Sequence, residues 1–239
     1  MGRGCVLTDS HLHMCEEGFP GDYRDFRSLS LAVSCTADPA EWNPCIASGD
    51  AHTVRSFGVH PWNSDIWHID VRSRLRSVLE EDPSRQVGEI GLDSKKGDVS
   101  SQLSPFTEQI DLASELGRVA SVHMAGAEKQ VLEVLRGHGK GCRGIILHSF
   151  SSESYAKPFA EIGCMFSVSP RILARSEEKV RRLLGAIPED RLLLESDAPH
   201  QGRFFTGMED FLRAVARIAD RSPEDLSEQI SGNLRRILG

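Results

Sequence analysis

The chain has 239 residues, of which 39% are hydrophobic and 26% are charged. This composition is that of a globular protein and excludes a disordered, collagen-like or membrane-embedded chain. Lys and Arg number 28 and Asp and Glu number 35, so the formal net charge is −7. An acidic chain does not hold nucleic acid by general electrostatics, because that binding depends on neutralising phosphates with Lys and Arg. If this protein handles phosphates, local features must overcome the global charge.

The compartment is indicated by what the sequence lacks. No apolar run approaches the roughly 18 residues of a membrane helix, and residues 1–9 lack the apolar stretch of a signal peptide. The 6 cysteines form no CxxC pair, which predicts reduced thiols. We therefore expect a cytosolic, enzyme-sized protein that acts as a monomer and has no membrane partner.

Short apolar segments recur along the chain, and most are followed by a longer segment of helical periodicity. Continuous apolar runs, rather than alternation, are typical of parallel strands covered on both faces. The predicted strands are 5–8, 31–35, 53–59, 86–90, 119–122, 144–147, 164–168 and 191–194. The predicted helices are 71–80, 106–116, 128–135, 176–184, 208–219 and 225–238.

Strands that alternate with helices over this length fit one (β/α)8 TIM barrel, an α/β fold that forms a single domain over residues 1–239. A doubly wound open sheet is the main alternative. It is disfavoured because no Gly-rich phosphate loop follows the first predicted strand. The first connection, residues 14–30, fits least well because its helical periodicity is poor.

Histidines gather where predicted strands end, which is where (β/α)8 barrels form their active sites. Two carboxylates lie in or at the end of predicted strands as well, and the one-residue spacing of His11 and His13 places both rings on one face. Imidazoles and carboxylates that converge in this way predict a divalent-metal site. Two ions bridged by a carboxylate would activate water and clamp a phosphoryl or acyl oxygen. The candidate residues are His11, His13, His60, Glu89, His123, His148 and Asp197.

These residues lie in segments that resemble the TatD-type metal-dependent hydrolases, relatives of the amidohydrolase superfamily with a TIM-barrel fold. Any one segment is a weak match, but the ordered set from Asp9 to Leu238 is highly specific. The matching segments are 8–13 (TDSHLH), 58–62 (GVHPW), 87–93 (VGEIGLD), 122–123 (VH), 147–151 (LHSFS), 193–199 (LLESDAP) and 232–238 (GNLRRIL).

The resemblance implies a metal-ligand set. His11 and His13 would bind a first ion beside Asp197, and Glu89 would bridge it to a second ion. The resemblance assigns that second ion to His123 and His148. The implied cofactors are two divalent ions, Mg, Mn or Zn.

The resemblance also implies an activity, the hydrolysis of phosphodiester bonds in DNA, commonly from a strand end. Asp197 and Glu89 are then catalytic as well as ligating, since Asp197 would take a proton from the attacking water. His60 would face the scissile phosphate, and Asp9 would support the histidine pair from behind.

The chain departs from the family pattern at the rim of the site. Ser94, Lys95 and Lys96 stand where the family usually has two aromatic residues, and Ala125 stands where an Arg is common. The loop 201–208 is short and lacks the usual Arg-Asn-Glu-Pro run. These departures affect substrate choice rather than metal chemistry, and Lys95 and Lys96 are candidates for phosphate contacts.

Several rim residues have two interpretations. Arg171, Arg175 and Arg203 either hold phosphates or are solvated surface charges. Trp62 either packs between helix and barrel or lines the mouth. Glu195 is expected to point away from the barrel interior.

Two other functions remain open: a metal-dependent amidohydrolase or deacylase that acts on C–N or ester bonds, and a catalytically weak binding protein that keeps the fold. Glu89 stands where a bridging, carboxylated Lys would be needed, which favours the phosphodiesterase. An intact ligand set argues against the binding protein. Two divalent ions would add about four positive charges, which favours a short strand, a frayed end or a small phosphodiester over tight tracking along duplex DNA.

Overall fold

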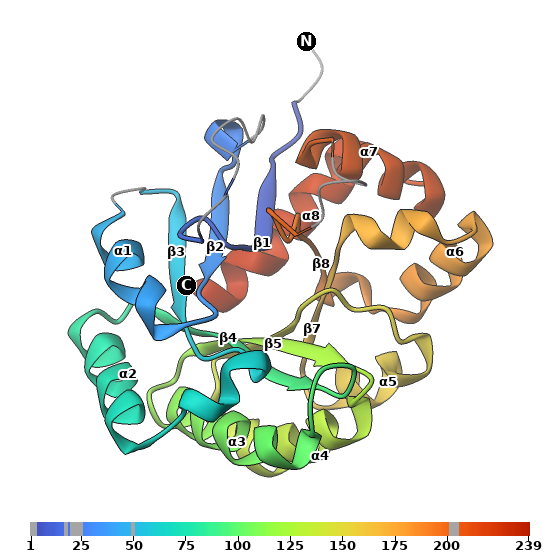
Figure 1. The fold of residues 1–239 in the computed structure, drawn as a ribbon. Coiled ribbons are helices and arrows are strands. Elements are labelled where there is room, and N and C mark those ends of the chain that lie inside the picture. The colour runs from blue at the N-terminus through green and yellow to red at the C-terminus, as the bar shows by residue number, and fades with distance from the viewer. Residues whose placement is uncertain (1–3, 17–18, 20–25, 49–50, 201–205) are drawn as a thin grey trace.

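The computed structural model describes residues 4–16, 19, 26–48, 51–200 and 206–239. Its 8 strands form one parallel sheet in chain order, and Figure 1 shows the helices in a ring around them. The strands are β1 (Thr8–Leu12), β2 (Leu31–Cys35), β3 (Thr53–Phe57), β4 (Gln86–Asp93), β5 (Val119–Ala125), β6 (Gly144–Leu147), β7 (Met165–Val168) and β8 (Leu192–Leu194). The sequential order confirms the predicted (β/α)8 barrel and excludes the open sheet, whose strand order reverses at a switch point.

One α-helix follows each strand from β2 to β7, and two follow β8; among the described residues β1 is followed only by a 3-10 helix, in the connection that fitted least well. Two of the helices, α1 and α5, are short, contain a Pro and were not predicted by the sequence analysis. The helices are α1 (Trp42–Ala47), α2 (Ile69–Glu81), α3 (Val99–Glu115), α4 (Glu128–His138), α5 (Glu153–Glu161), α6 (Glu177–Ala186), α7 (Met208–Ala219) and α8 (Pro223–Leu238).

Helix α3 begins earlier than predicted. Asp98 caps it by accepting a hydrogen bond from the backbone N–H of Ser100, and Pro105 lies inside the helix rather than at its start. An interior Pro removes one backbone hydrogen bond and usually ends a helix. Here Pro105 and Phe106 are buried against the barrel, and this packing outweighs the lost bond.

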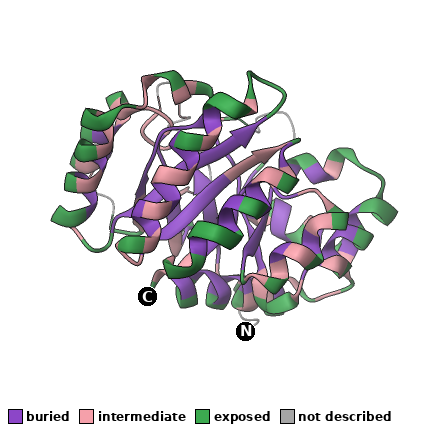
Figure 2. Cartoon of the chain, turned by 90° about the horizontal axis from the view of Figure 1, so that it is seen from below, coloured by how far each residue is buried: buried purple, intermediate pink, exposed green. Residues whose placement is uncertain are grey.

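Strand β6 is apolar on both faces, as its continuous hydrophobic run predicted, whereas β1 begins at the end of the predicted run 5–8 and is largely polar. Ile145 and Leu147 of β6 belong to the larger core between barrel and helices, whereas Ile146 belongs to a second, smaller core. Leu234 and Ile237 of α8 join this second core. Figure 2 shows buried strands and helices whose outer faces are exposed.

The two ends of the sheet meet beyond the last residue of β8. The backbone N–H of Asp197 donates to the carbonyl of His11 at 3.0 Å, and that of His13 donates to the carbonyl of Ala198 at 2.8 Å. These bonds draw two segments that are distant in sequence together at the carboxyl ends of the strands. Within the part of the chain that the structure describes, no helix is long and apolar enough to cross a membrane.

Candidate metal centre

All of the candidate site residues come together at the carboxyl ends of the strands. All of them except His11 line one cavity of about 370 Å³. His11 is fully buried behind the cavity wall. His123 is partly exposed and the others are buried. The residues and their positions are His11 in β1, His13 just after it, His60 after β3, Glu89 in β4, His123 in β5, His148 after β6 and Asp197 after β8.

Gly91 allows two of these strands to approach closely. Its φ is +148°, and a Cβ added there would lie 2.0 Å from the backbone oxygen of His123. Only glycine tolerates both conditions. The close contact of β4 with β5 brings Glu89 beside His123.

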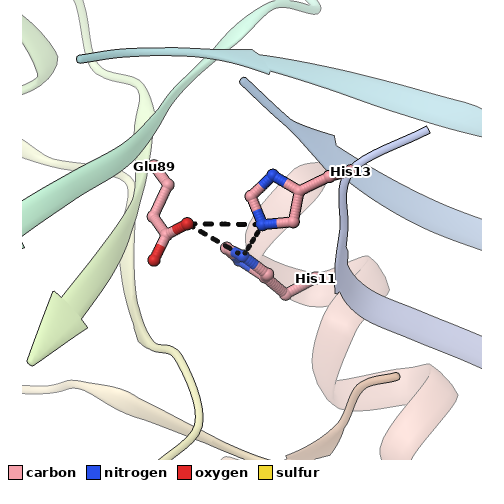
Figure 3. A group of neighbouring side chains, drawn as sticks. All are labelled: His11, His13 and Glu89. Atoms are coloured by element: carbon pink, nitrogen blue, oxygen red, sulfur yellow. Dashed lines mark hydrogen bonds and ion pairs between the residues drawn. The ribbon is translucent and has the colours of Figure 1, made fainter. Parts of the chain in front are cut away.

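One group of donor atoms has the spacing that a metal ion requires. The Nε2 atoms of His11 and His13 are 3.1 Å apart, and each is 3.4 Å from Glu89 Oε2 (Figure 3). Asp197 Oδ1 lies 3.9 Å from His11 Nε2 and 3.6 Å from His13 Nε2. A tetrahedral ion with bonds of about 2.1 Å separates its ligand atoms by about 3.4 Å. The donor atoms of His11, His13 and Glu89 therefore have the spacing of a divalent-ion site, and Asp197 lies beside them in a second group with His11 and His148.

The other oxygen of Glu89 faces a second group of histidines. Glu89 Oε1 lies 2.9 Å from His123 Nδ1 and 3.6 Å from His148 Nε2. His60 Nε2 is also 3.6 Å from this oxygen. The carboxylate thus lies between two sets of nitrogen donors, one at each oxygen.

Side chains on the far side of two rings turn the other ring nitrogen toward the site. The Nε2 of His123 lies 3.1 Å from Asp93 Oδ2, which turns Nδ1 toward Glu89. Burial alone lowers the pKa of His123, but hydrogen bonds with Asp93 and Glu89 outweigh this effect and raise the pKa to about 9, so an ion bound at Nδ1 would displace a proton. The Nδ1 of His11 is 2.9 Å from Ser121 Oγ, which leaves Nε2 for an ion. This pattern, a ligand nitrogen backed by a hydrogen bond from the other ring nitrogen, is typical of metal sites.

His60 presents an N–H, rather than a lone pair, to the site. Its Nδ1 accepts the backbone N–H of Trp62 at 3.2 Å, so the proton of the neutral ring is on Nε2. Burial lowers the pKa of His60 to about 3, which keeps the ring neutral. His60 is therefore arranged to donate a hydrogen bond into the cavity rather than to bind an ion.

Burial and charge set the protonation of the remaining groups. Burial lowers the pKa of His11 and of His148, which keeps both rings neutral and able to bind an ion. Burial alone raises the pKa of Asp197, but His148 and His13 beside it outweigh this effect and hold the pKa below its usual range. Asp197 is therefore ionised.

Glu195 is a site residue that the sequence analysis placed wrongly. It is fully buried inside the barrel, and its Oε1 lies 2.7 Å from His148 Nδ1, although the ring N–H is not aligned for a hydrogen bond. Its Oε1 also accepts the backbone N–H of Ser149 at 2.8 Å. The strand alternation that predicted an outward side chain ends at Leu194, so it did not apply.

Asp9 lies where the resemblance placed it, behind the histidine pair. Its Oδ1 accepts the backbone N–H groups of His11 at 3.1 Å and of Ser196 at 3.0 Å. One carboxylate oxygen thus ties β1 to the segment that carries Asp197.

The rim contains an exposed aromatic ring. Trp62 is 51% exposed and lines the cavity, so it does not act as a buried packing anchor. Its Nε1–H donates to Asp93 Oδ2 at 2.7 Å, and Lys96 Nζ lies 3.6 Å from its ring centroid. Arg171 also lines this cavity, with its Nη2 atom 3.9 Å from Asp197 Oδ2. The candidate Arg203 lies outside the described residues.

Comparison with known proteins identifies the family. A family model described as TatD related DNase matches residues 8–239. A relative in Mycobacterium tuberculosis, named an uncharacterized metal-dependent hydrolase TatD, is 26% identical over 98% of each chain. A relative in Cronobacter sakazakii, named 3'-5' ssDNA/RNA exonuclease TatD, is 33% identical, but the match covers 60% of this chain and 56% of that protein.

The fold is shared with solved structures. The crystal structure of the TatD homologue YjjV from Escherichia coli superposes with a TM-score of 0.84 at 22% identity, and the match covers 98% of each chain. Because the family model spans almost the entire sequence, the chain belongs to the TatD related DNase family of metal-dependent hydrolases.

Proposed function

We propose that the site binds two divalent ions and hydrolyses a phosphodiester bond of a nucleic acid. The observation that carries this proposal is the position of Glu89, whose two oxygens face different groups of histidines. His11, His13 and Asp197 would hold one ion with Glu89 Oε2. His123 and His148 would hold the other with Glu89 Oε1. The ligand set suits Zn, Mn or Mg.

Bound ions would supply an activated water and neutralise the charge that develops on the phosphoryl oxygens. Asp197 is ionised because its pKa is held low, and it would serve both as an ion ligand and as the base that takes the proton from the attacking water. His60 donates its Nε2 proton to a phosphate oxygen and orients the substrate. Both groups are buried in the cavity wall, where solvent screens their charges and dipoles less than at the surface.

A nucleic-acid substrate is supported by the Cronobacter sakazakii relative, whose name specifies single-stranded DNA or RNA. The chain spans 56% of that relative in the match, so this substrate is carried over as a proposal. A strand end or short single strand suits a chain of net charge −7. The positive charges that would hold it are confined to the ions and a few rim residues.

We further propose that the protein acts in the cytosol as a monomer. All 6 cysteines are free thiols, as expected in a reducing compartment. Among the described residues, Trp62 and Ile69 are the exposed large hydrophobic side chains, and two separate side chains do not form an apolar patch of interface size.

Replacement of Glu89 tests the function. Glu89→Gln keeps the shape of the side chain but removes the charge that two ions share, so we expect loss of both bound ions and a fall in activity of at least about 100-fold. Metal analysis after Mn or Zn loading and hydrolysis of a single-stranded oligonucleotide measure the two effects. Glu161→Gln, an exposed Glu remote from the site, is the control.

Two results would contradict the proposal. One is a wild-type protein that binds no divalent ion at saturating Mn or Zn. The other is a loaded enzyme that cleaves N-acyl or carboxylic ester substrates and leaves DNA and RNA intact, which would identify it as an amidohydrolase or deacylase.

A further inference from the structure

A second cavity opens directly from the metal centre. It has a volume of about 270 Å³, and His123, His148 and Arg171 line both cavities. The two cavities are therefore adjacent, and an extended ligand can occupy both at once. We call this second cavity the basic groove; its other lining residues include Lys95, Arg175 and Glu128.

Positive charge dominates the groove despite the acidity of the chain. Lys95, Arg171 and Arg175 line it together with one carboxylate, that of Glu128, whose Oε1 already accepts a hydrogen bond from Ser152 Oγ at 2.6 Å. Among the described residues no ion pair is formed by the ammonium group of Lys95 or the guanidinium group of Arg175. Cations that are not paired within the protein are available to a ligand.

Contacts with the protein position the backbone of Lys95 and the guanidinium group of Arg175. The backbone N–H of Lys95 donates to Asp93 Oδ1 at 2.8 Å, and the other oxygen of Asp93 contacts His123. Arg175 Nη1 donates to the carbonyl of Ser151 at 3.0 Å, which leaves the rest of its guanidinium group for other acceptors. The backbone of Lys95 is thus held by Asp93, the same residue that contacts the candidate metal ligand His123.

The groove is lined by hydroxyl groups as well. Ser149 Oγ and Ser169 Oγ lie 2.8 Å apart. Hydroxyls and cations in one channel match a backbone of phosphates and sugars, which such side chains bind without reading the bases. A small phosphodiester would fill the metal-centre cavity alone and make no contact with the groove.

We propose that the basic groove binds the phosphate next to the scissile one, so that a strand with a second phosphodiester is preferred over a small phosphodiester. Lys95 and Arg175 bind that second phosphate, and Arg171 lies between it and the metal centre. This inference rests on the proposed function, because it takes the substrate of the site to be a nucleic-acid strand. The proposal assigns different roles to the two neighbouring lysines, because Lys95 lines the groove, whereas Lys96 lies over Trp62.

Binding of a fluorescently labelled single-stranded hexanucleotide tests the inference. The oligonucleotide carries phosphorothioate linkages, which resist hydrolysis, so binding is measured in the otherwise wild-type, metal-loaded background. In that background we expect Lys95→Ala or Arg175→Ala to weaken binding by roughly two- to fivefold, which is the strength of an exposed ion pair. Each variant should also reduce the slope of log K against log salt by about 0.7, the value for one lost phosphate contact on a single strand. Lys179→Ala, an exposed Lys of α6, is the matched control and should change neither quantity.

Kinetics in the otherwise wild-type enzyme distinguish the groove from the proposed function. The ratio of kcat/KM for the hexanucleotide to that for a dinucleotide should fall by at least about twofold in Lys95→Ala and in Arg175→Ala. If both variants cleave both substrates with an unchanged kcat/KM ratio and an unchanged salt slope, the groove does not bind a second phosphate. The proposed phosphodiesterase function would still stand. Cleavage of neither substrate by the loaded wild-type enzyme would overturn the proposed function itself.

Discussion

At the scale of single residues, the site depends on side chains that do not face the cavity. Asp93 contacts His123, Ser121 contacts His11, and Glu195 lies against His148. Each contact is on the ring nitrogen that points away from the candidate ions. A buried histidine that is free to rotate would offer its lone pair in several directions, so these partners determine which nitrogen binds.

Glu195 provides a test of this idea. Burial raises the pKa of Glu195 to about 8, so its ionised form beside His148 is disfavoured by desolvation. Above pH 8, where Glu195 is ionised, we expect Glu195→Gln to weaken metal binding by about 10- to 100-fold, because the ring of His148 loses a charged partner; below that pH the effect should be smaller. Titration with Mn or Zn measures the change, and Glu161→Gln serves as the control. Wild-type affinity in Glu195→Gln would show that His148 is held by packing alone.

At the scale of elements, α8 stabilises the barrel through contacts outside the metal site. Leu234 and Ile237 pack in the smaller core with residues of β2, β5, β6, β7 and β8. The Nδ2 of buried Asn233 donates to the carbonyls of Leu192 at 3.0 Å and of Glu189 at 2.9 Å, where β8 begins. None of these residues lines the metal-centre cavity, so they affect stability rather than chemistry.

Neighbouring residues of α8 should respond to Ala in opposite directions. Asn233→Ala removes the donor to the buried Leu192 carbonyl and should lower the free energy of unfolding by about 1–3 kcal/mol. Gly232→Ala should raise it by about 0.5–1 kcal/mol, because Gly232 is exposed in the helix and its added Cβ would meet nothing within 4 Å. Urea unfolding measures both. Equal effects of the two substitutions would contradict this account.

At the scale of the whole molecule, the barrel brings buried carboxylates and histidines together, and a bound cation would offset the cost of burying the carboxylate charges. Strands that are far apart in the sequence bring Glu89 and Asp197 into one buried cluster with four candidate metal-binding histidines. Any ligand that binds the folded chain alone stabilises it by mass action. Divalent ions should therefore act on the stability of the entire protein as well as on the reaction.

Thermal unfolding measures this coupling. An ion at 100 times its Kd contributes about 2.7 kcal/mol, which corresponds to a rise in Tm of about 5–10 °C for a chain of this size. A chelator should reverse the rise, and Glu89→Gln should abolish most of it. If Mn and Zn leave the wild-type Tm unchanged at millimolar concentration, the cluster does not bind ions tightly.

Much of the fold was predictable because parallel strands have continuous apolar runs. β2 and β6 coincide with their predicted ranges, and α7 does as well. Helix α3 was predicted too short because a Pro is typical of a helix start, and the burial of Pro105 inside the helix is a tertiary effect. The short helix α5 has few turns to show periodicity and was missed for that reason.

The sequence by itself determined which residues meet at the mouth of the barrel, because a parallel barrel brings every strand end to the same side. It did not determine how those residues are turned. Glu195 lies inside the barrel, His60 has its proton on Nε2, and Lys95 lines the basic groove whereas Lys96 lies over Trp62. Each of these outcomes depends on a partner from a distant segment or on a backbone that has left the regular strand. Local periodicity contains no information about either, so only the tertiary structure decided them.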